Sequence, residues 1–179
     1  MGAPFEGRLV RLRAREPEDE PLLFRWFNDP EVTENLVIRY PLSHAQERQF
    51  IESCSNPGYD RASFAVEAIN EAKLIGGVDL VNASPENRSA SLGIAIGDKE
   101  HWDSGYGTDT MITVCRFGFE MMNLRRIELT VYARNERAQH VYEKVGFKVE
   151  GRLRDGRYKF GGYEDVIVMG LLEGELVIG

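Results

Sequence analysis

The spacing of hydrophobic residues in the first part of the chain predicts one short strand and two helices. Residues 8–13 (RLVRLR) intersperse leucine and valine with arginine, which predicts a half-exposed strand. Hydrophobic side chains then recur at helical spacing up to Phe27, after a start rich in proline and acids, and Asn28-Asp29-Pro30 ends that helix. Residues 43–54 open with Ser-His-Ala-Gln, the pattern of a capping box, and predict a second helix.

Three stretches in the middle of the chain alternate with a period of two, which is typical of half-buried strands. They are residues 63–69 (SFAVEAI), 73–81 (KLIGGVDLV) and 89–96 (SASLGIAI), and short polar turns separate them. Because short turns join antiparallel neighbours, we expect these three strands to form a meander.

Helix and strand patterns alternate in the next part of the chain. Hydrophobic residues between Thr108 and Met122 recur at helical spacing, and residues 126–132 (RIELTVY) predict a strand. Asn135 is a typical first residue, and Gly146 a typical stop, for the helix predicted between them.

The end of the chain predicts two strands, residues 147–153 and 163–172, separated by a glycine-containing loop at residues 154–162 (RDGRYKFGG). No repeat, low-complexity tract or linker divides the 179 residues. We therefore expect a single domain spanning residues 1–179, with strands and helices mixed along the chain.

Composition and charge narrow the possible functions. Hydrophobic residues make up 42% and charged residues 28% of the chain, as in a folded globular domain. No hydrophobic run approaches the roughly 20 residues that cross a bilayer, and the start lacks a secretory pattern, so we expect a cytoplasmic protein without a membrane partner. The net charge of −7 disfavours nucleic acid and favours a cationic partner such as an amine.

Metal and thiol chemistry find little support in the sequence. Cys54 and Cys115 are too few for a disulfide framework or a metal cluster. His44, His101 and His140 lack the spacing of metal ligands, so we expect no metal site and a surface position for His101.

The loop Ser104-Gly105-Tyr106-Gly107-Thr108 leads from a predicted strand into a predicted helix. Such a junction presents unpaired backbone N–H groups at the positive end of the helix dipole, and glycine lets an anion approach the backbone. The functional interpretation is a diphosphate site; the alternative is an ordinary strand-to-helix turn. A P-loop is excluded because no lysine follows Gly107, and a dinucleotide loop because Thr110 occupies the position of its third glycine.

Two blocks of sequence carry a resemblance to a known family. Residues 102–107 (WDSGYG) resemble the diphosphate loop Gln/Arg-x-x-Gly-x-Gly/Ala of GNAT acyl-CoA N-acyltransferases, with Trp102 at the first position. Residues 135–147 (NERAQHVYEKVGF) resemble that family's N-x-x-A-x-x-x-Y-E-K-x-G-F block. The tail from residue 147 onward and the NDPEV segment at residues 28–32 are similar to the RimJ/RimL-like branch of the family.

The resemblance implies a twisted mixed sheet of six to seven strands, splayed at the acyl-CoA site and flanked by about four helices. It also implies acetyl-CoA as co-substrate, no metal, and a pantetheine arm pairing with the strand at residues 92–96. The cofactor-binding residues would be Ile94, Ala95, Ile96, Trp102, Asp103, Ser104, Gly105, Tyr106, Gly107, Thr108 and Asn135. Asn135 also has the purely structural interpretation of a helix cap.

Direct attack of an amine on the thioester needs no enzyme nucleophile, so Cys115 is not required. By its place in the family block, Tyr142 would protonate the departing sulfur; the alternative is a core position beside Ala138 and Val145. Glu128 points away from the hydrophobic face of its strand and is the candidate general base, directly or through water; the alternative is a solvated carboxylate.

The branch resemblance implies acetylation of an amine-bearing substrate, and our first choice is the α-amine of a protein or peptide N-terminus. Small amines such as polyamines or antibiotics are the alternative, and a non-catalytic acyl-CoA sensor is the alternative from another class. Residues 28–42 and 155–163 are expected to shape the acceptor pocket. The basic run Arg152, Arg154 and Arg157 fits a solvated loop, CoA phosphates or an acidic peptide. The resemblance also allows a homodimer.

Overall fold

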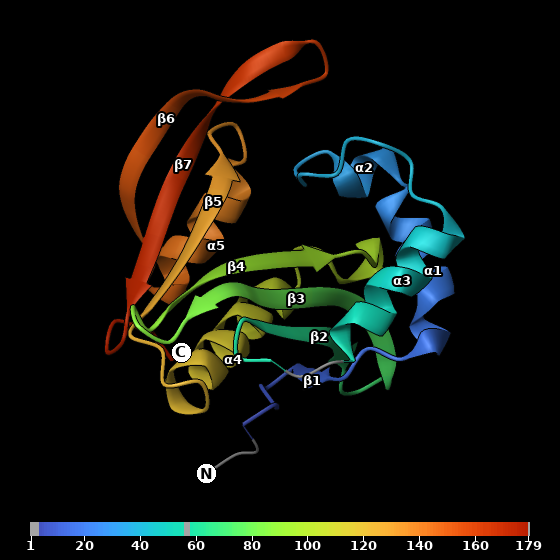
Figure 1. Cartoon of the computed structure of the whole chain (residues 1–179), viewed down its shortest axis with the longest axis horizontal. Coiled ribbons are helices and arrows are strands. Elements are labelled where there is room, and N and C mark those ends of the chain that lie inside the picture. Colours follow the sequence, from blue (N-terminus) through green and yellow to red (C-terminus); the bar gives the residue numbers. More distant parts are fainter. Residues whose placement is uncertain (1–3, 56–57, 179) are drawn as a thin grey trace.

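A seven-stranded mixed sheet forms the centre of the molecule (Figure 1). The computed structural model describes residues 4–55 and 58–178, so the outermost residues of the predicted 1–179 domain lie outside the described residues. The strands stand in the order β1-β2-β3-β4-β5-β7-β6. Their bounds are Val10–Arg13 (β1), Arg61–Ala68 (β2), Lys73–Ser84 (β3), Ser89–Ile96 (β4), Arg126–Tyr132 (β5), Lys148–Lys159 (β6) and Gly162–Leu172 (β7).

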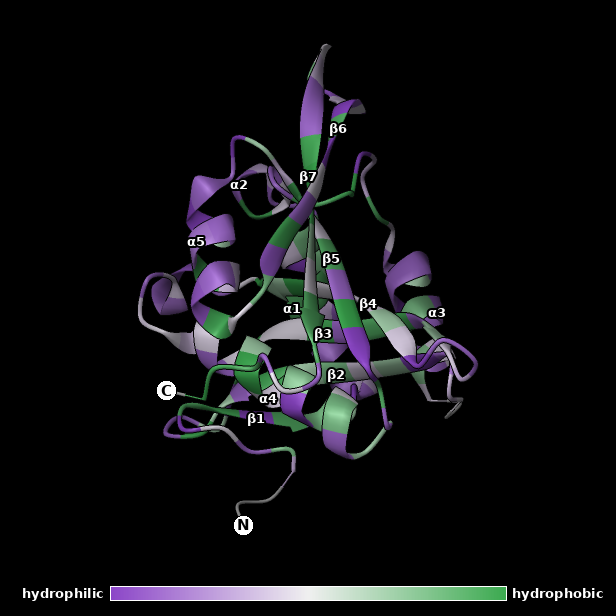
Figure 2. Cartoon of the chain, turned by 90° about the vertical axis from the view of Figure 1, so that its left-hand side faces the viewer, coloured by the Kyte–Doolittle hydropathy of each residue, from purple (hydrophilic) through white to green (hydrophobic). Residues whose placement is uncertain are grey.

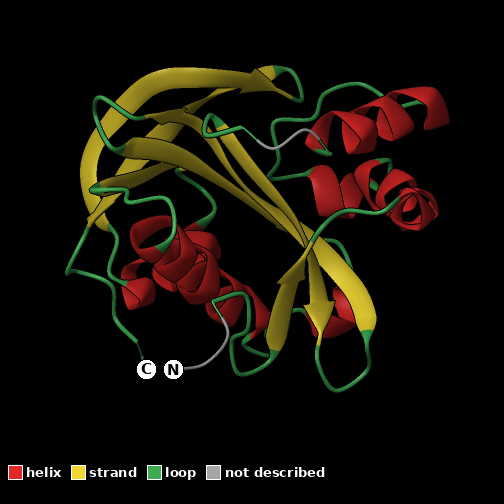
Figure 3. Ribbon diagram, turned by 60° about the horizontal axis from the view of Figure 1, so that its bottom comes forward, coloured by secondary structure: helices red, strands yellow, loops and turns green. Residues whose placement is uncertain are grey.

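Helices cover the sheet from both sides (Figure 3). They are α1 (Glu20–Phe27), α2 (Pro30–Thr33), α3 (His44–Cys54), α4 (Tyr106–Glu120) and α5 (Glu136–Val145), with short 3₁₀ turns at Pro17–Asp19 and Lys99–His101. Successive side chains of β2 point to opposite faces of the sheet. Val66 belongs to the main core under α4, and Ala65 to the smaller core with α1 and α3. Helix α5 is hydrophilic over most of its outer surface (Figure 2).

The sheet splits between β4 and β5. These two strands run parallel and pair only where residues 89–91 face residues 126–128, and Figure 1 shows them diverging beyond that point. The opposite edge of β5 is paired with β7 along residues 126–132. The split therefore leaves the facing backbone edges of residues 92–96 and 129–132 without a neighbouring strand.

The predicted fold class is confirmed: a mixed sheet splayed between β4 and β5, with the meander β2-β3-β4 at residues close to those expected. One helical turn, α2, exceeds the four expected helices. Asp29 and Pro30 end α1 as predicted, but the Asp29 carboxylate accepts a hydrogen bond from the Glu31 N–H at 2.9 Å and so begins a new helix with proline at its first position.

The loop predicted at residues 154–162 is wrong. Strand β6 continues to Lys159, and β7 starts at Gly162. The connection is a two-residue turn, Phe160–Gly161, in which both residues have positive φ (53° and 79°). Cross-strand pairing extends the hairpin through the glycine-containing segment, and an irregularity in register between Leu153 and Arg157 accommodates the extra residues.

Three local predictions are confirmed by hydrogen bonds. Ser43 and Gln46 form the reciprocal capping box of α3. The Asn135 carboxamide oxygen accepts a hydrogen bond from the Ala138 N–H at 3.2 Å and caps α5. Gly146 ends α5 in the left-handed conformation, with φ of 113°.

Candidate active site

The glycine loop ends at the N-terminus of α4, the longest of the described helices. Gly105 is its N-cap residue, has φ of 87° and provides no side chain for capping. Among the described residues, none accepts a hydrogen bond from the backbone N–H groups of residues 104–108. A Cβ atom at Gly107 would meet nothing within 4 Å. Free donors, open space and the positive end of a 15-residue helix fit the diphosphate of acetyl-CoA.

The position of this helix end is fixed by Asp109. Its carboxylate accepts hydrogen bonds from three successive N–H groups, those of Arg8 (3.1 Å), Leu9 (2.8 Å) and Val10 (3.0 Å). The first turn of α4 is thereby attached to the start of β1, and the loop before it is held against the sheet.

The polar group of Trp102, its indole N–H, binds the end of β4 and does not point to the diphosphate loop. Its indole N–H donates to the Ile96 carbonyl at 2.7 Å. The guanidinium of Arg137, from the first turn of α5, lies 5.5 Å from the centre of the Trp102 ring, and its Nε is 2.8 Å from an Asp103 oxygen. A cation therefore reaches the loop from α5, and sequence reasoning missed it although Arg137 stands two residues after Asn135.

His101 corrects a prediction, because it is buried and not on the surface. Its ring is 5% exposed, and its Nε2 lies 3.0 Å from a Glu71 oxygen. The centres of the His101 and Tyr106 rings are 4.7 Å apart in an edge-to-face arrangement, so His101 packs against the first residue of α4.

The three β4 residues predicted to bind the pantetheine arm are not equivalent. The Gly97 N–H donates to Ile75 on β3, whereas the Ile96 carbonyl points away from β3 to Trp102. By strand alternation, Ile94 directs its N–H and carbonyl into the split, and Ala95 directs its own toward β3. Ile94 thus offers both backbone groups to a ligand in the split, and Ile96 offers its N–H.

Tyr142 packs against the core, and its hydroxyl could still donate a proton. Its ring packs against the main core, 6.2 Å from the centre of the Phe147 ring. Part of the residue remains exposed, but its surroundings are largely protein, and burial raises the pKa of Tyr142 to about 12. The hydroxyl has no hydrogen-bond partner among the described residues. It therefore stays protonated at neutral pH.

Glu128 lies at the base of the split. It faces Ser91 at the last β4–β5 pair, and its carboxylate is half-exposed and 3.2 Å from Arg126 Nη2. Its side chain shares a strand face with Thr130 and Tyr132, which line the pocket described below. Cys115 is fully buried, and burial raises the pKa of its thiol far above the usual range, so it is no nucleophile.

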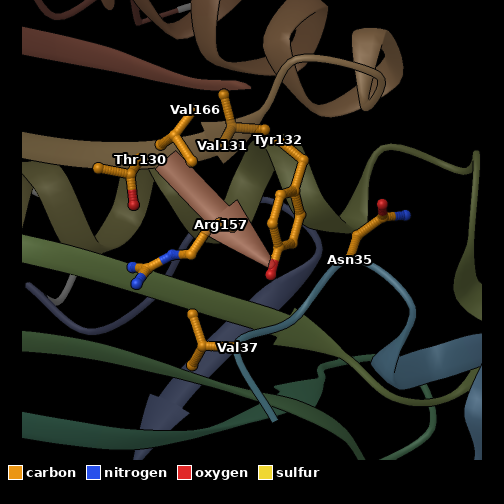
Figure 4. A pocket seen from close by; sticks show the side chains of 7 residues that line it. All are labelled: Asn35, Val37, Thr130, Val131, Tyr132, Arg157 and Val166. Atoms are coloured by element: carbon orange, nitrogen blue, oxygen red, sulfur yellow. The ribbon is translucent and has the colours of Figure 1, made fainter. Parts of the chain in front are cut away.

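A small surface pocket, open to solvent, lies beside the unpaired part of β5 (Figure 4). Seven described residues line it, from β5, β6, β7 and the segment after α2, and Arg157 is the only charged one. In Figure 4 its side chain lies between Thr130 and Val37. The lining residues are Asn35, Val37, Thr130, Val131, Tyr132, Arg157 and Val166. The pocket uses parts of both segments predicted to shape the acceptor site.

Lys159 joins the two sides of this pocket. Its ammonium donates to the carbonyls of Thr33 (2.6 Å), Glu34 (3.2 Å) and Leu36 (2.7 Å), so the tip of the β6–β7 hairpin holds the segment after α2. Burial, and then the neighbouring Arg134 and Arg39, lower the pKa of Lys159. The hairpin extension is therefore part of the site.

Over residues 4–55 and 58–178, no three His, Cys, Asp or Glu side chains are grouped to hold a metal ion. Within the same residues, no helix combines the length and the hydrophobicity needed to span a membrane.

Comparison with known proteins decides the family. The family model of the acetyltransferase (GNAT) domain matches residues 9–148. The chain belongs to the GNAT acetyltransferase family. It is an acetyl-CoA-dependent N-acetyltransferase, as the blocks at residues 102–107 and 135–147 predicted.

The names of similar GNAT proteins give different acceptors. The spermidine N(1)-acetyltransferase of Vibrio cholerae is 28% identical over 152 residues, covering 83% of this chain and 78% of that protein. YdaF of Bacillus subtilis, whose name gives it provisionally as a ribosomal N-acetyltransferase, is 32% identical over 105 residues, covering 59% and 57%. A structure of spermidine N-acetyltransferase from Vibrio cholerae with CoA and spermine has a TM-score of 0.85 at 27% identity, covering 93% of this chain and 97% of that one.

Proposed function

We propose that this GNAT enzyme transfers the acetyl group of acetyl-CoA directly to the α-amine of a peptide or protein N-terminus, and that it belongs to the RimJ/RimL-like branch. The observation that supports this acceptor is the pocket beside β5, which is open to solvent and has no carboxylate in its lining. A polyamine carries several ammonium groups and would need acidic partners there, whereas a peptide N-terminus requires a groove and one site for its amine.

The chain's own residues have separate roles in this proposal. The N–H groups of residues 104–108 bind the diphosphate, Arg137 adds a cation where the loop has Trp102, and Ile94 pairs with the pantetheine arm. The Asn135 carboxamide oxygen is used in capping α5, so its NH₂ group is the part that can reach the arm. Acetyl-CoA supplies the thioester carbon that the amine attacks.

Proton transfer is assigned to two residues. As the carbon–sulfur bond breaks, the Tyr142 hydroxyl, which is protonated at neutral pH, donates its proton to the departing sulfur. Glu128 accepts the proton released by the amine through water, because its half-exposed carboxylate is in contact with solvent.

A free-thiol release assay with acetyl-CoA tests the acceptor. We expect peptides with a free N-terminus to be acetylated with a higher kcat/KM than spermidine or aminoglycosides, and mass spectrometry should place the acetyl group on the α-amine. Rapid turnover of spermidine without turnover of any peptide would contradict the proposal. CoA binding without turnover of any amine would indicate a sensor.

A small polyamine is the second candidate acceptor. Three relatives named spermidine N(1)-acetyltransferase are 28% identical to the chain, and a structural neighbour was solved with spermine. The same assay distinguishes the two candidates.

A further inference from the structure

Arg157 is a cation in the acceptor pocket that has no partner among the described residues. It is half-buried and lines the pocket beside Thr130 and Val37 (Figure 4). No described residue forms an ion pair or a hydrogen bond with its guanidinium. A half-buried guanidinium carries five N–H donors, and with no bond to a described residue these donors favour an anion in the pocket.

The carboxylate that should neutralise Arg157 is already occupied. Glu164 is its direct neighbour across the β6–β7 hairpin, so both side chains start on the same face. Glu164 instead binds Arg134: one oxygen is 3.1 Å from the Arg134 Nε, and the other accepts the Arg134 backbone N–H at 3.1 Å. Both oxygens of Glu164 are used, which leaves the charge of Arg157 without compensation from the hairpin.

The surroundings of the pocket are cationic in a chain whose net charge is −7. Arg134 and Arg39 both lie near enough to Lys159 to lower its pKa. Glu34 also lies 3.5 Å from Arg134, so Glu34 and Glu164 share that one arginine, and Glu128 lies 3.2 Å from Arg126. A polycationic acceptor would be repelled here, whereas an acceptor carrying a carboxylate would be attracted.

Large hydrophobic side chains are exposed on the two segments that Lys159 joins. Val37 is 68%, Tyr40 is 79% and Phe160 is 72% exposed, and the bonds from Lys159 hold the turn with Phe160 next to the segment with Val37. Exposed aromatic residues together with arginine are typical of surfaces that bind peptides or proteins.

We propose that the acceptor is a peptide with a carboxylate side chain close to its N-terminus, and that the Arg157 guanidinium binds this carboxylate and sets the specificity. This inference rests on the peptide acceptor proposed above and names its chemical class. The geometry of a guanidinium allows two parallel hydrogen bonds to one carboxylate, which lysine cannot reproduce.

Matched peptides test the inference. The probes are hexapeptides with a free N-terminal alanine and Glu, Gln or Lys at one of positions two to four, compared by thiol release with the wild-type enzyme, Arg157→Gln and Arg157→Glu. For the wild type we expect the best Glu peptide to exceed its Gln counterpart about tenfold in kcat/KM, the value of one charge-assisted hydrogen bond of about 1.4 kcal/mol. Arg157→Gln should bring this ratio close to one, mainly by raising KM for the Glu peptide. Arg157→Glu should favour the Lys peptide.

Arg125→Gln is the matched control, because Arg125 is a half-exposed arginine that pairs with Glu173 away from the pocket. Its Glu-to-Gln ratio should equal that of the wild type. Equal wild-type rates for Glu and Gln peptides would overturn the role of Arg157 and leave the peptide acceptor intact. Faster acetylation of free glutamate than of any peptide would overturn the peptide class. Turnover of spermidine alone would overturn the proposed function itself.

Discussion

Gly105 and Gly107 lie two residues apart in the diphosphate loop, and we expect alanine to act oppositely at the two positions. Gly105 has φ of 87°, a conformation that costs an L-residue roughly 1–2 kcal/mol. Gly107 lies in the first turn of α4 in open space, where alanine is a better helix former by roughly 0.5–1 kcal/mol. The family motif also accepts alanine at the second position and not at the first.

The backbone strain in Gly105→Ala should lower either the melting temperature or the affinity for acetyl-CoA. If the loop keeps its conformation, the melting temperature falls by roughly 2–4 °C for each kcal/mol, as expected for a chain of this size. If the loop relaxes, the strain returns when acetyl-CoA binds, and 1–2 kcal/mol weakens affinity roughly 5- to 30-fold. Gly107→Ala should raise the melting temperature and leave the affinity for acetyl-CoA within about twofold.

Thermal unfolding and calorimetric titration with acetyl-CoA measure both outcomes in the same preparations. Gly151→Ala is the control for an added methyl group, because Gly151 also faces open space and lies on β6. A Gly105→Ala protein with unchanged melting temperature and unchanged affinity would refute the reasoning, because the left-handed turn would then be irrelevant to the site.

Three further predictions concern single side chains. Tyr142→Phe should lower kcat by roughly 10²-fold or more, the usual contribution of a general acid, while calorimetry shows an unchanged affinity for acetyl-CoA; equal turnover would remove Tyr142 from the mechanism. Arg137→Ala should weaken acetyl-CoA binding about tenfold by removing one charge-assisted contact. An affinity equal to that of the Arg125→Ala control would show that the Arg137 guanidinium does not reach the cofactor. Glu47 is 2% exposed, and its Oε1 has no hydrogen-bond partner among the described residues. Burial raises the pKa of Glu47. The stability that this raised pKa contributes is present below about pH 4.5 and is lost as pH rises through the raised pKa. Glu47→Gln should therefore raise the melting temperature at pH 7 and lose this advantage near pH 4, and a constant difference across that range would contradict the assignment.

The parts of the site that depend on residues close together in the sequence could be predicted. The Asn135 cap and the Gly146 stop follow from local chemistry, and the structure shows both of them. The family blocks added the split between β4 and β5, which no periodicity reveals.

Contacts between distant segments could not be predicted. The length of the β6–β7 hairpin is set by cross-strand pairing, and the glycines in residues 154–162 indicated a loop instead. Lys159 binds carbonyls more than 120 residues earlier in the chain. Glu164 binds Arg134, 30 residues earlier in the chain, and is therefore not available to Arg157, which pairs with no residue in the described part of the chain.

An amide-resolved NMR titration with CoA tests the central claim most directly, because it reports on the backbone N–H groups themselves. The largest shift changes should fall on the amides of residues 104–108, accompanied by Ile94 inside the split, and they should saturate together. Shift changes that leave residues 104–108 unaffected and concentrate elsewhere, for example on α1 and α3 across the sheet, would contradict the account.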